Sequence, residues 1–230
     1  MATLFLVRHG LTAMTGPVLA GRTPGVHLDD RGTKQAATLG ERLAAIPLSA
    51  IVSSPLERCV ETASAIRTAQ QLEPSFEVDE RLVECGYGDW TGRQIKDLVK
   101  DPLWKLVQTQ PSAVRFPGGE SLTEMATRAV AAVRERDAAL PQTATWVACT
   151  HGDIIKAILA DALGLHLDQF QRIVPDPASV SVIRYTATRP YVLRMNDVGG
   201  DLTALVAAPR KKRRGAQDAT VGGGAGGGSV

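Results

Sequence analysis

Three short apolar runs punctuate the chain, and each of them ends at polar residues. They cover residues 4–7, 50–53 and 145–150. Continuous apolar runs of this length are typical of buried strands, so we predict a strand at each position. Two later runs rich in β-branched residues, 180–186 and 191–196, predict two more strands. The last run follows a proline and is therefore expected at the edge of a sheet.

Helical spacing of apolar residues fills the intervals between these strands. Asp29 precedes an apolar stripe that predicts a helix over residues 30–45. Residues 54–57 read Ser-Pro-Leu-Glu, which predicts a capping box with proline in the first helical position. A second capping box, formed by Ser121 and Glu124, predicts the start of a long helix.

The remaining segments contribute smaller elements. Residues 70–90 are loop-like, with one short strand predicted at 76–78. Residues 91–110, interrupted by Pro102 and followed by Pro111, predict two short helices over one face of the domain. A further helix is predicted directly after residue 151. This alternation of strand and helix predicts an α/β fold.

Composition and charge change the picture only at the C-terminus. The 230 residues carry a net charge of +2, but residues 210–214 are Arg-Lys-Lys-Arg-Arg and supply five of the 26 basic residues. Without this run the net charge is slightly negative, so the folded domain lacks the excess of positive charge that is typical of a nucleic-acid-binding domain. We expect one domain over residues 1–208 and a disordered, basic and glycine-rich tail over residues 209–230.

Cysteine usage and hydropathy indicate the compartment. The three cysteines, Cys59, Cys85 and Cys149, are an odd number without C-x-x-C spacing, so neither a disulfide framework nor a zinc ribbon is indicated. No segment approaches the ~18 consecutive apolar residues that a membrane span needs. We therefore expect a cytoplasmic protein without a membrane partner, and the sequence leaves open whether it is a homodimer.

The candidate chemistry lies where the three apolar strands end. Arg8 and His9 follow the first strand, Arg58 lies near the helix start after the second, and His151 follows the third. In open α/β sheets ligands bind outside the carboxyl ends of the strands, where helix N-termini also favour anions. Each residue alone would more often have a structural role. Two arginines and two histidines together indicate a site for phosphate, because its oxygens accept hydrogen bonds from several donors at once.

Two other classes of protein use similar residues. A metal-dependent hydrolase would bind ions through His9, His151, Glu84 and Asp153, but the sequence has no H-E-x-x-H or comparable ligand spacing. A histidine pair flanked by arginines is also a poor cation site. A non-catalytic phospholigand sensor would use the same anion pocket without turnover, and this alternative stays open.

The motifs at these positions resemble a known family. They are Arg8-His9-Gly10, Ser54-Pro55-Leu56-Glu57-Arg58, Leu82 with Glu84, Gly118-Gly119-Glu120-Ser121 and His151-Gly152-Asp153. In this order they resemble the histidine phosphatase superfamily over residues 3–200. The resemblance implies a three-layer α/β/α sandwich with a mostly parallel central sheet, a phosphohistidine intermediate, and neither a metal nor another cofactor.

The resemblance also implies roles for individual residues. His9 would be the nucleophile, Arg8, Arg58 and His151 would clamp the phosphoryl group, and Glu84 would transfer protons. The partner would be a small phosphorylated metabolite. The segment between Trp90 and Gly118 is short for a mutase of this family, which favours a phosphatase over phosphoglycerate-mutase-type transfer. The substrate-binding residues implied are Arg8, Thr12, Thr15, Gly21, Arg22, Thr23, Arg58, Glu84, His151 and Gly152.

These roles set conditions on ionisation. His9 must be neutral to attack phosphorus, with its other N–H held by an acceptor such as a backbone carbonyl. Glu84 needs a raised pKa, for which Tyr87 and Trp90 are candidate apolar neighbours. His151 would contribute most as a cation.

Overall fold

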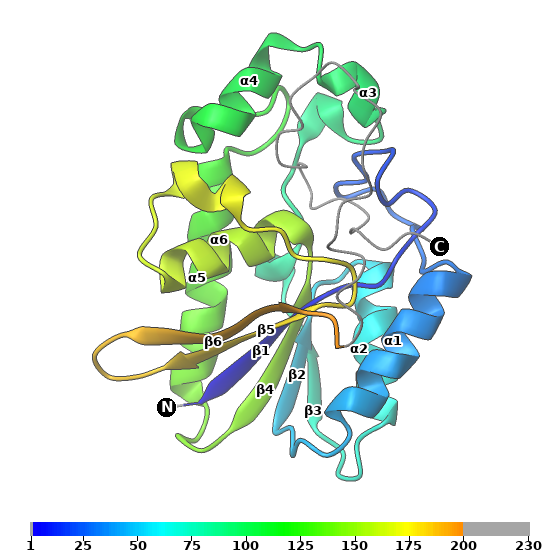
Figure 1. The fold of residues 1–230 in the computed structure, drawn as a ribbon, viewed down its shortest axis with the longest axis vertical. Helices are drawn as coiled ribbons and strands as arrows, with labels where there is room; N and C mark the ends of the chain where they lie inside the picture. The colour runs from blue at the N-terminus through cyan, green and yellow to red at the C-terminus, as the bar shows by residue number, and fades with distance from the viewer. Residues whose placement is uncertain (1, 200–230) are drawn as a thin grey trace, which may run out of the picture.

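The computed structural model describes residues 2–199, which contain one six-stranded sheet (Figure 1). The strands lie in the order β3-β2-β4-β1-β5-β6. The first four strands along the chain are parallel neighbours, whereas β5 and β6 are antiparallel additions at one side. The strands are β1 Thr3–Arg8, β2 Ala50–Ser53, β3 Ser75–Val78, β4 Thr145–Thr150, β5 Val180–Tyr185 and β6 Pro190–Asp197.

The register of the central strands fixes where the candidate residues emerge. Arg8 at the end of β1 lies opposite Thr150 at the end of β4. Ser53 at the end of β2 lies opposite Cys149 of β4. The carboxyl ends of β1, β2 and β4 therefore meet at one edge of the sheet, and the predicted parallel arrangement of these three strands is confirmed.

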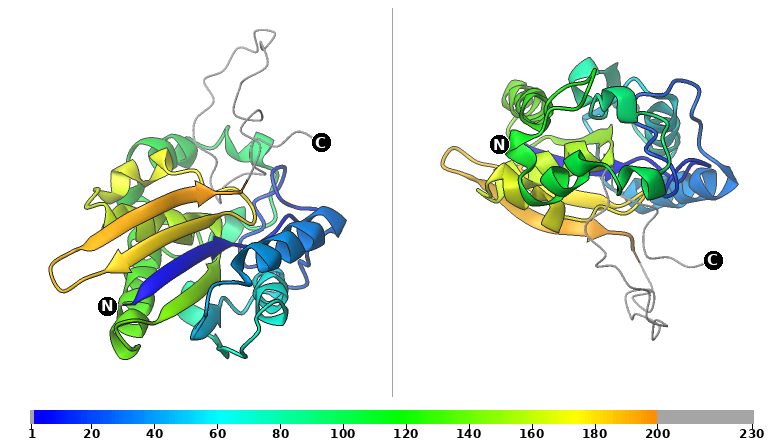
Figure 2. Two further views of the ribbon diagram at one scale, coloured as in Figure 1. Left: turned by 60° about the horizontal axis from the view of Figure 1, so that its bottom comes forward. Right: turned by 90° about the horizontal axis from the view of Figure 1, so that it is seen from above.

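Helices cover both faces of the sheet, and α3 and α4 lie beyond the carboxyl ends of the parallel strands (Figures 1 and 2). The structure thus has the predicted α/β/α layers. The predicted loop 70–90 contains two 3-10 turns, and two further turns flank α5 and α6. The α-helices are α1 Asp30–Leu43, α2 Glu57–Thr68, α3 Ile95–Leu98, α4 Pro102–Thr109, α5 Leu122–Ala139 and α6 Gly152–Ala162, and the 3-10 helices are Glu80–Leu82, Gly88–Trp90, Pro111–Ala113 and Leu167–Arg172.

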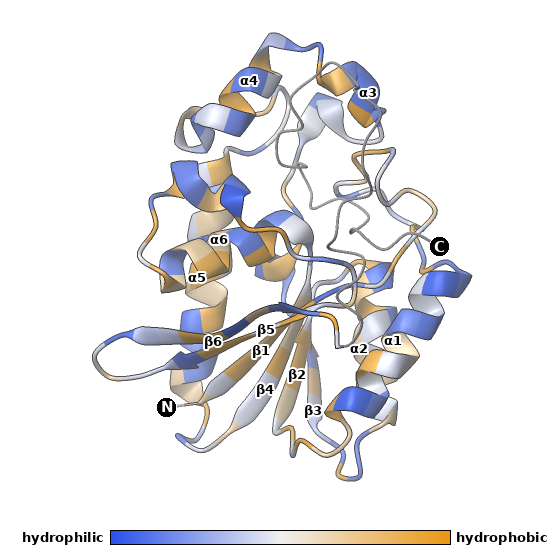
Figure 3. Ribbon diagram, viewed as in Figure 1, coloured by the Kyte–Doolittle hydropathy of each residue, from blue (hydrophilic) through white to orange (hydrophobic). Residues whose placement is uncertain are grey.

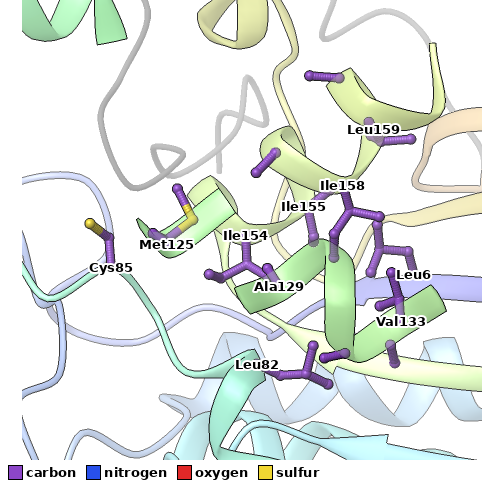
Figure 4. Close-up of a cluster of buried hydrophobic side chains, with 14 of the residues drawn as sticks. Leu6, Leu82, Cys85, Met125, Ala129, Val133, Ile154, Ile155, Ile158 and Leu159 are labelled. Carbon is purple, nitrogen blue, oxygen red and sulfur yellow. The ribbon is translucent and has the colours of Figure 1, made fainter. Parts of the chain in front are cut away.

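The side chains of β1 alternate between two hydrophobic clusters. Leu6 belongs to the cluster under α5 and α6, and Figure 4 shows it beside Val133 and Ile158. Val7 points to the opposite face and packs with Leu39 of α1 and with residues of α2. The central strands are accordingly apolar on both faces, whereas α1 contains many hydrophilic residues (Figure 3). Burial on both faces is what a parallel sheet between two helical layers requires.

Local capping signals gave two correct helix starts and one wrong one. Asp29 caps α1 by accepting from the Gly32 N–H, and Ser121 forms its predicted capping box at the start of α5. The box predicted at residues 54–57 does not form, because α2 begins at Glu57 without a side-chain cap. The hydroxyl of Ser54 instead lies 2.7 Å from Nε2 of His151. The same hydroxyl accepts from the N–H of Leu56 at 3.4 Å, so its shorter hydrogen bond is the tertiary one.

None of the helices in the described part of the chain is long and apolar enough to cross a membrane. The predicted tail, residues 209–230, lies outside the described residues, so its disorder stays a prediction.

Candidate active site

A small open cavity of about 40 Å³ lies at the carboxyl edge of the sheet. Residues from the end of β1, the loop that follows it, the start of α2 and the segment before α3 meet there. The cavity therefore joins segments that are far apart in sequence, at the place that the strand ends predict. The lining residues are Arg8, His9, Thr12, Thr15, Gly16, Val18, Leu19, Ala20, Gly21, Arg58, Glu84, Tyr87 and Ile95.

Close backbone packing fixes the chain beside His9. A Cβ atom on Gly10 would lie 2.7 Å from the carbonyl oxygen of Gly32 at the start of α1. The N–H of Gly10 donates to the hydroxyl of Thr62 on α2. The φ of Gly10 is not positive, so the glycine is needed for this close approach rather than for a sharp turn.

His9 presents an unprotonated nitrogen toward Arg58. Its Nδ1–H donates to the carbonyl oxygen of Gly10 at 2.7 Å, and Nε2 accepts from Nε of Arg58 at 3.3 Å. Burial and the charges of Arg58 and Arg8 lower the pKa of His9 well below its ordinary value, against a small opposing effect of the Gly10 hydrogen bond. The expected backbone acceptor is confirmed, and His9 is neutral at pH 7 with its lone pair on Nε2.

The two arginines supply buried positive charge beside this nitrogen. Arg58 donates through Nη2 to the carbonyl oxygen of Gly21 at 2.7 Å, whereas its buried Nη1 has no hydrogen-bond partner within residues 2–199. Arg8 donates through Nη1 to the carbonyl oxygen of Pro175. Burial lowers the pKa of Arg8 to about 10, with Glu84 opposing that effect, so Arg8 stays cationic at pH 7. An unpartnered buried guanidinium nitrogen is a donor available to an anion.

His151 lies behind His9, with the ring centroids 5.2 Å apart, and is fully buried. The guanidinium of Arg58 can only donate, so Nδ1 of His151 accepts from Nη2 at 3.3 Å and Nε2–H donates to Ser54. Burial, Arg58 and His9 lower the pKa of His151 well below its ordinary value. His151 is therefore neutral here, because burial and the nearby arginine disfavour a second positive charge, so the condition under which it would contribute most is not met.

Glu84 lines the cavity and is 4% exposed. Its Oε1 accepts from the N–H of Cys85 at 2.9 Å. Burial, and then the charge of Asp153, raise the pKa of Glu84 to about 7, against opposing effects of the Cys85 N–H, Arg58 and Arg8. The raised pKa expected for this carboxyl is found, but a second carboxylate contributes to it alongside the burial.

Beyond its place in the His151-Gly152-Asp153 motif, the sequence suggested for Asp153 only the role of a ligand in the alternative metal site. In the structure it is fully buried, accepts from the hydroxyl of Tyr87 at 2.7 Å, and pairs with Lys156 at 3.1 Å. Lys156 in turn donates to Gln171. The i,i+3 spacing of Asp153 and Lys156 on a predicted helix was the signal that could have found this ion pair. A buried charge of this kind also holds the Tyr87 ring in the cavity wall.

The remaining predicted substrate-binding residues fall into two groups. Thr12, Thr15 and Gly21 line the cavity, and the two threonine hydroxyls lie 2.9 Å apart. Arg22, Thr23 and Gly152 are not among the lining residues. The Arg22 side chain is engaged with Glu84 and Glu120, the Thr23 hydroxyl donates to the Ala20 carbonyl, and Gly152 opens α6.

The family model of the histidine phosphatase superfamily (branch 1) matches residues 4–198. Phosphoserine phosphatase 1 of Hydrogenobacter thermophilus is 34% identical over 205 residues, which are 85% of this chain and 92% of that protein. A probable phosphoglycerate mutase of Salmonella choleraesuis is 31% identical over 188 residues, covering 80% of this chain and 86% of that protein.

A solved structure supports the same grouping. The mycobacterial glucosyl-3-phosphoglycerate phosphatase superposes with a TM-score of 0.76 at 26% identity, covering 84% of this chain and 98% of that one. The residues that the family model matches end before the basic segment at residues 210–214.

Proposed function

Because this chain belongs to branch 1 of the histidine phosphatase superfamily, we propose that it hydrolyses small phosphomonoesters through a phosphohistidine formed on His9. The single observation that carries the proposal is the surroundings of His9. An unprotonated Nε2 lies 3.3 Å from Nε of Arg58, whose Nη1 is buried without a hydrogen-bond partner in the described residues. A nucleophile and an available anion donor thus share one cavity.

In the first step Nε2 of His9 attacks phosphorus and the bond from phosphorus to the alcohol oxygen breaks. Arg58 and Arg8 bind the non-bridging oxygens, which carry the charge in the transition state. Glu84, protonated up to a pKa of about 7, donates its proton to the leaving oxygen. The products of this step are the free alcohol, the phosphohistidine and the Glu84 carboxylate.

In the second step a water molecule attacks the phosphohistidine. The Glu84 carboxylate takes a proton from that water, and the bond from Nε2 to phosphorus breaks as the new oxygen bond forms. Inorganic phosphate leaves with His9 neutral and Glu84 protonated again. A carboxyl with a pKa near the working pH suits both directions of proton transfer.

The experiment is a rapid-quench incubation with a phosphomonoester labelled on phosphorus. We expect an acid-labile, base-stable phosphoenzyme that maps to His9, together with release of inorganic phosphate. The His27→Ala variant is the matched control, because His27 is exposed and pairs with Glu61 outside the cavity. A chelator should leave the rate unchanged.

Three results would contradict the proposal. Release that stops on chelation would indicate a bound metal. Transfer of the phosphoryl group to an added phosphoglycerate, in preference to water, would identify the mutase alternative suggested by the second relative. Phosphate binding without turnover or phosphoenzyme would identify a sensor.

A further inference from the structure

The backbone of Glu84 is held by two arginines that the proposed reaction does not use. The carbonyl oxygen of Glu84 accepts from Nε of Arg22 at 2.8 Å and from Nη2 of Arg128 at 3.1 Å. One carboxylate bridges these arginines, because Oε1 of Glu120 lies 2.7 Å from Nη2 of Arg22 and 2.6 Å from Nη2 of Arg128. Oε2 of Glu120 also accepts from Nε of Arg128, so the ion pair between Glu120 and Arg128 is bidentate.

The same carboxylate holds the chain on the other side of Cys85. Oε1 of Glu120 accepts from the N–H of Gly86 at 2.8 Å, and the N–H of Glu120 donates to the carbonyl oxygen of Gly86 at 2.8 Å. A Cβ atom on Gly119 would lie 2.2 Å from that carbonyl oxygen. The two loops therefore touch backbone to backbone, and Glu84 sits in a segment that is fixed on both sides.

The three charged residues come from three different parts of the fold. Arg22 follows the loop that lines the cavity, Glu120 precedes α5, and Arg128 lies on α5, where it also donates to the Val83 carbonyl. Glu120 and Arg128 are mostly buried, whereas the Arg22 side chain is 41% exposed. Although burial raises the pKa of Glu120, hydrogen bonds from Arg128 and Gly86 lower it below its ordinary value, so Glu120 is ionised.

We propose that Arg22, Glu120 and Arg128 form a positioning cluster that fixes the Glu84 backbone and thereby aims its carboxyl at the leaving oxygen. This inference rests on the proposed function, in which Glu84 is the proton donor. It assigns Arg22 to Glu84 instead of to the substrate. A displacement of about 1 Å in a catalytic group can cost on the order of 10²-fold in rate, so the cluster is expected to affect proton transfer while leaving phosphate binding unchanged.

The test compares two substrates in the Glu120→Ala variant. An alkyl phosphate needs a proton on its leaving oxygen, whereas 4-nitrophenyl phosphate has a good leaving group and does not. Because kcat/KM reports the phosphorylation step, we expect it to fall by about 100-fold for the alkyl ester and by no more than about threefold for the aryl ester. The inhibition constant of inorganic phosphate should stay at its parental value.

Matched variants separate positioning from general damage. Glu77→Ala breaks a surface ion pair with Arg136, which lies on α5 as Arg128 does. This variant should change kcat/KM for neither substrate. Arg22→Ala should reproduce the substrate-selective loss, and Arg22→Lys should recover only part of it, because lysine lacks the fork that reaches two acceptors. Arg22 is the more exposed member, so its variants keep the test available if Glu120→Ala does not fold.

The outcomes are distinct. The positioning role would be overturned if kcat/KM fell equally for both substrates or for neither. It would also be overturned if Arg22→Ala weakened phosphate inhibition without a selective loss on the alkyl ester. The Glu84→Gln enzyme is the reference: if it shows no selective loss on the alkyl ester, Glu84 is not the proton donor and the proposed function itself fails at that step.

Discussion

The chain places a His-Gly pair at the end of two neighbouring strands, and the structure gives the two histidines different properties. His9 after β1 lines the cavity, carries its proton on Nδ1 and presents Nε2 beside Arg58. His151 after β4 is fully buried, accepts at Nδ1 and donates from Nε2 to Ser54. The dipeptide is the same, so the partner of each ring nitrogen decides which histidine can act as a nucleophile.

The largest effects are expected from removing each imidazole in turn, which tests whether only His9 acts as the nucleophile. His9→Ala removes the attacking nitrogen, so kcat/KM should fall on the order of 10⁴-fold or more and no phosphoenzyme should be trapped. His151→Ala should still form phosphoenzyme, with a loss on the order of 10²-fold, because it removes a hydrogen-bond partner that positions Arg58. Quench-flow trapping with both variants measures the difference. If His151→Ala also forms no phosphoenzyme, the two histidines are not functionally distinct.

Arg58 hydrogen-bonds to both rings, through Nε to His9 and Nη2 to His151. Arg58→Ala should lose ~3–4 kcal/mol of transition-state stabilisation, the scale of a lost oxyanion donor. Arg58→Lys should not restore the rate, because an ammonium cannot reach both imidazoles in the same geometry. Steady-state kcat/KM of the two variants, with thermal unfolding to verify folding, would show it. Near-parental values would remove Arg58 from the transition state.

The pH profile sharpens the comparison by titrating the groups beside His9. Glu84 must be protonated to donate, and its pKa is raised to about 7, so kcat/KM for an alkyl phosphate should fall as pH rises above about 7. The pKa of His9 is lowered well below 6.5, so protonation of His9 should cause no loss near that pH. Glu84→Gln should flatten the alkaline limb. An alkaline limb that persists in Glu84→Gln would assign it to another group.

Ser54 offers the smallest perturbation, because its hydroxyl bonds to His151 and Ser54 is not among the residues that line the cavity. Ser54→Ala leaves the buried Nε2–H facing the Cys59 sulfur, a weaker acceptor 3.4 Å away, so the free energy of unfolding should decrease by about 1–3 kcal/mol. The rate should fall by less than about tenfold, since the lost contact is at Nε2 of His151, whereas Arg58 bonds to Nδ1. Denaturant unfolding and kcat/KM measure the two effects. Ser64→Ala, at an exposed position of α2, is the control, and a large rate loss without destabilisation would place Ser54 in the reaction.

The sequence by itself determined the elements and the edge at which the chemistry gathers. Asp29 and the Ser121 box cap helices through bonds to residues only three positions away, and the apolar runs identify strands buried on both faces. Parallel strands then bring Arg8, His9 and His151 to one edge. These features depend on neighbours in the chain or on a general rule of parallel sheets, which is why they were predictable.

Only the tertiary structure decided how these residues are ionised and held. Ser54 bonds to a histidine 97 positions away instead of capping its own helix. His151 is neutral because it is buried beside a guanidinium, and the pKa of Glu84 is raised by burial and by the charge of Asp153. Arg22 meets a carboxylate 98 positions away. The charge and direction of a buried polar group depend on desolvation and on partners supplied by distant segments, and no local pattern contains either.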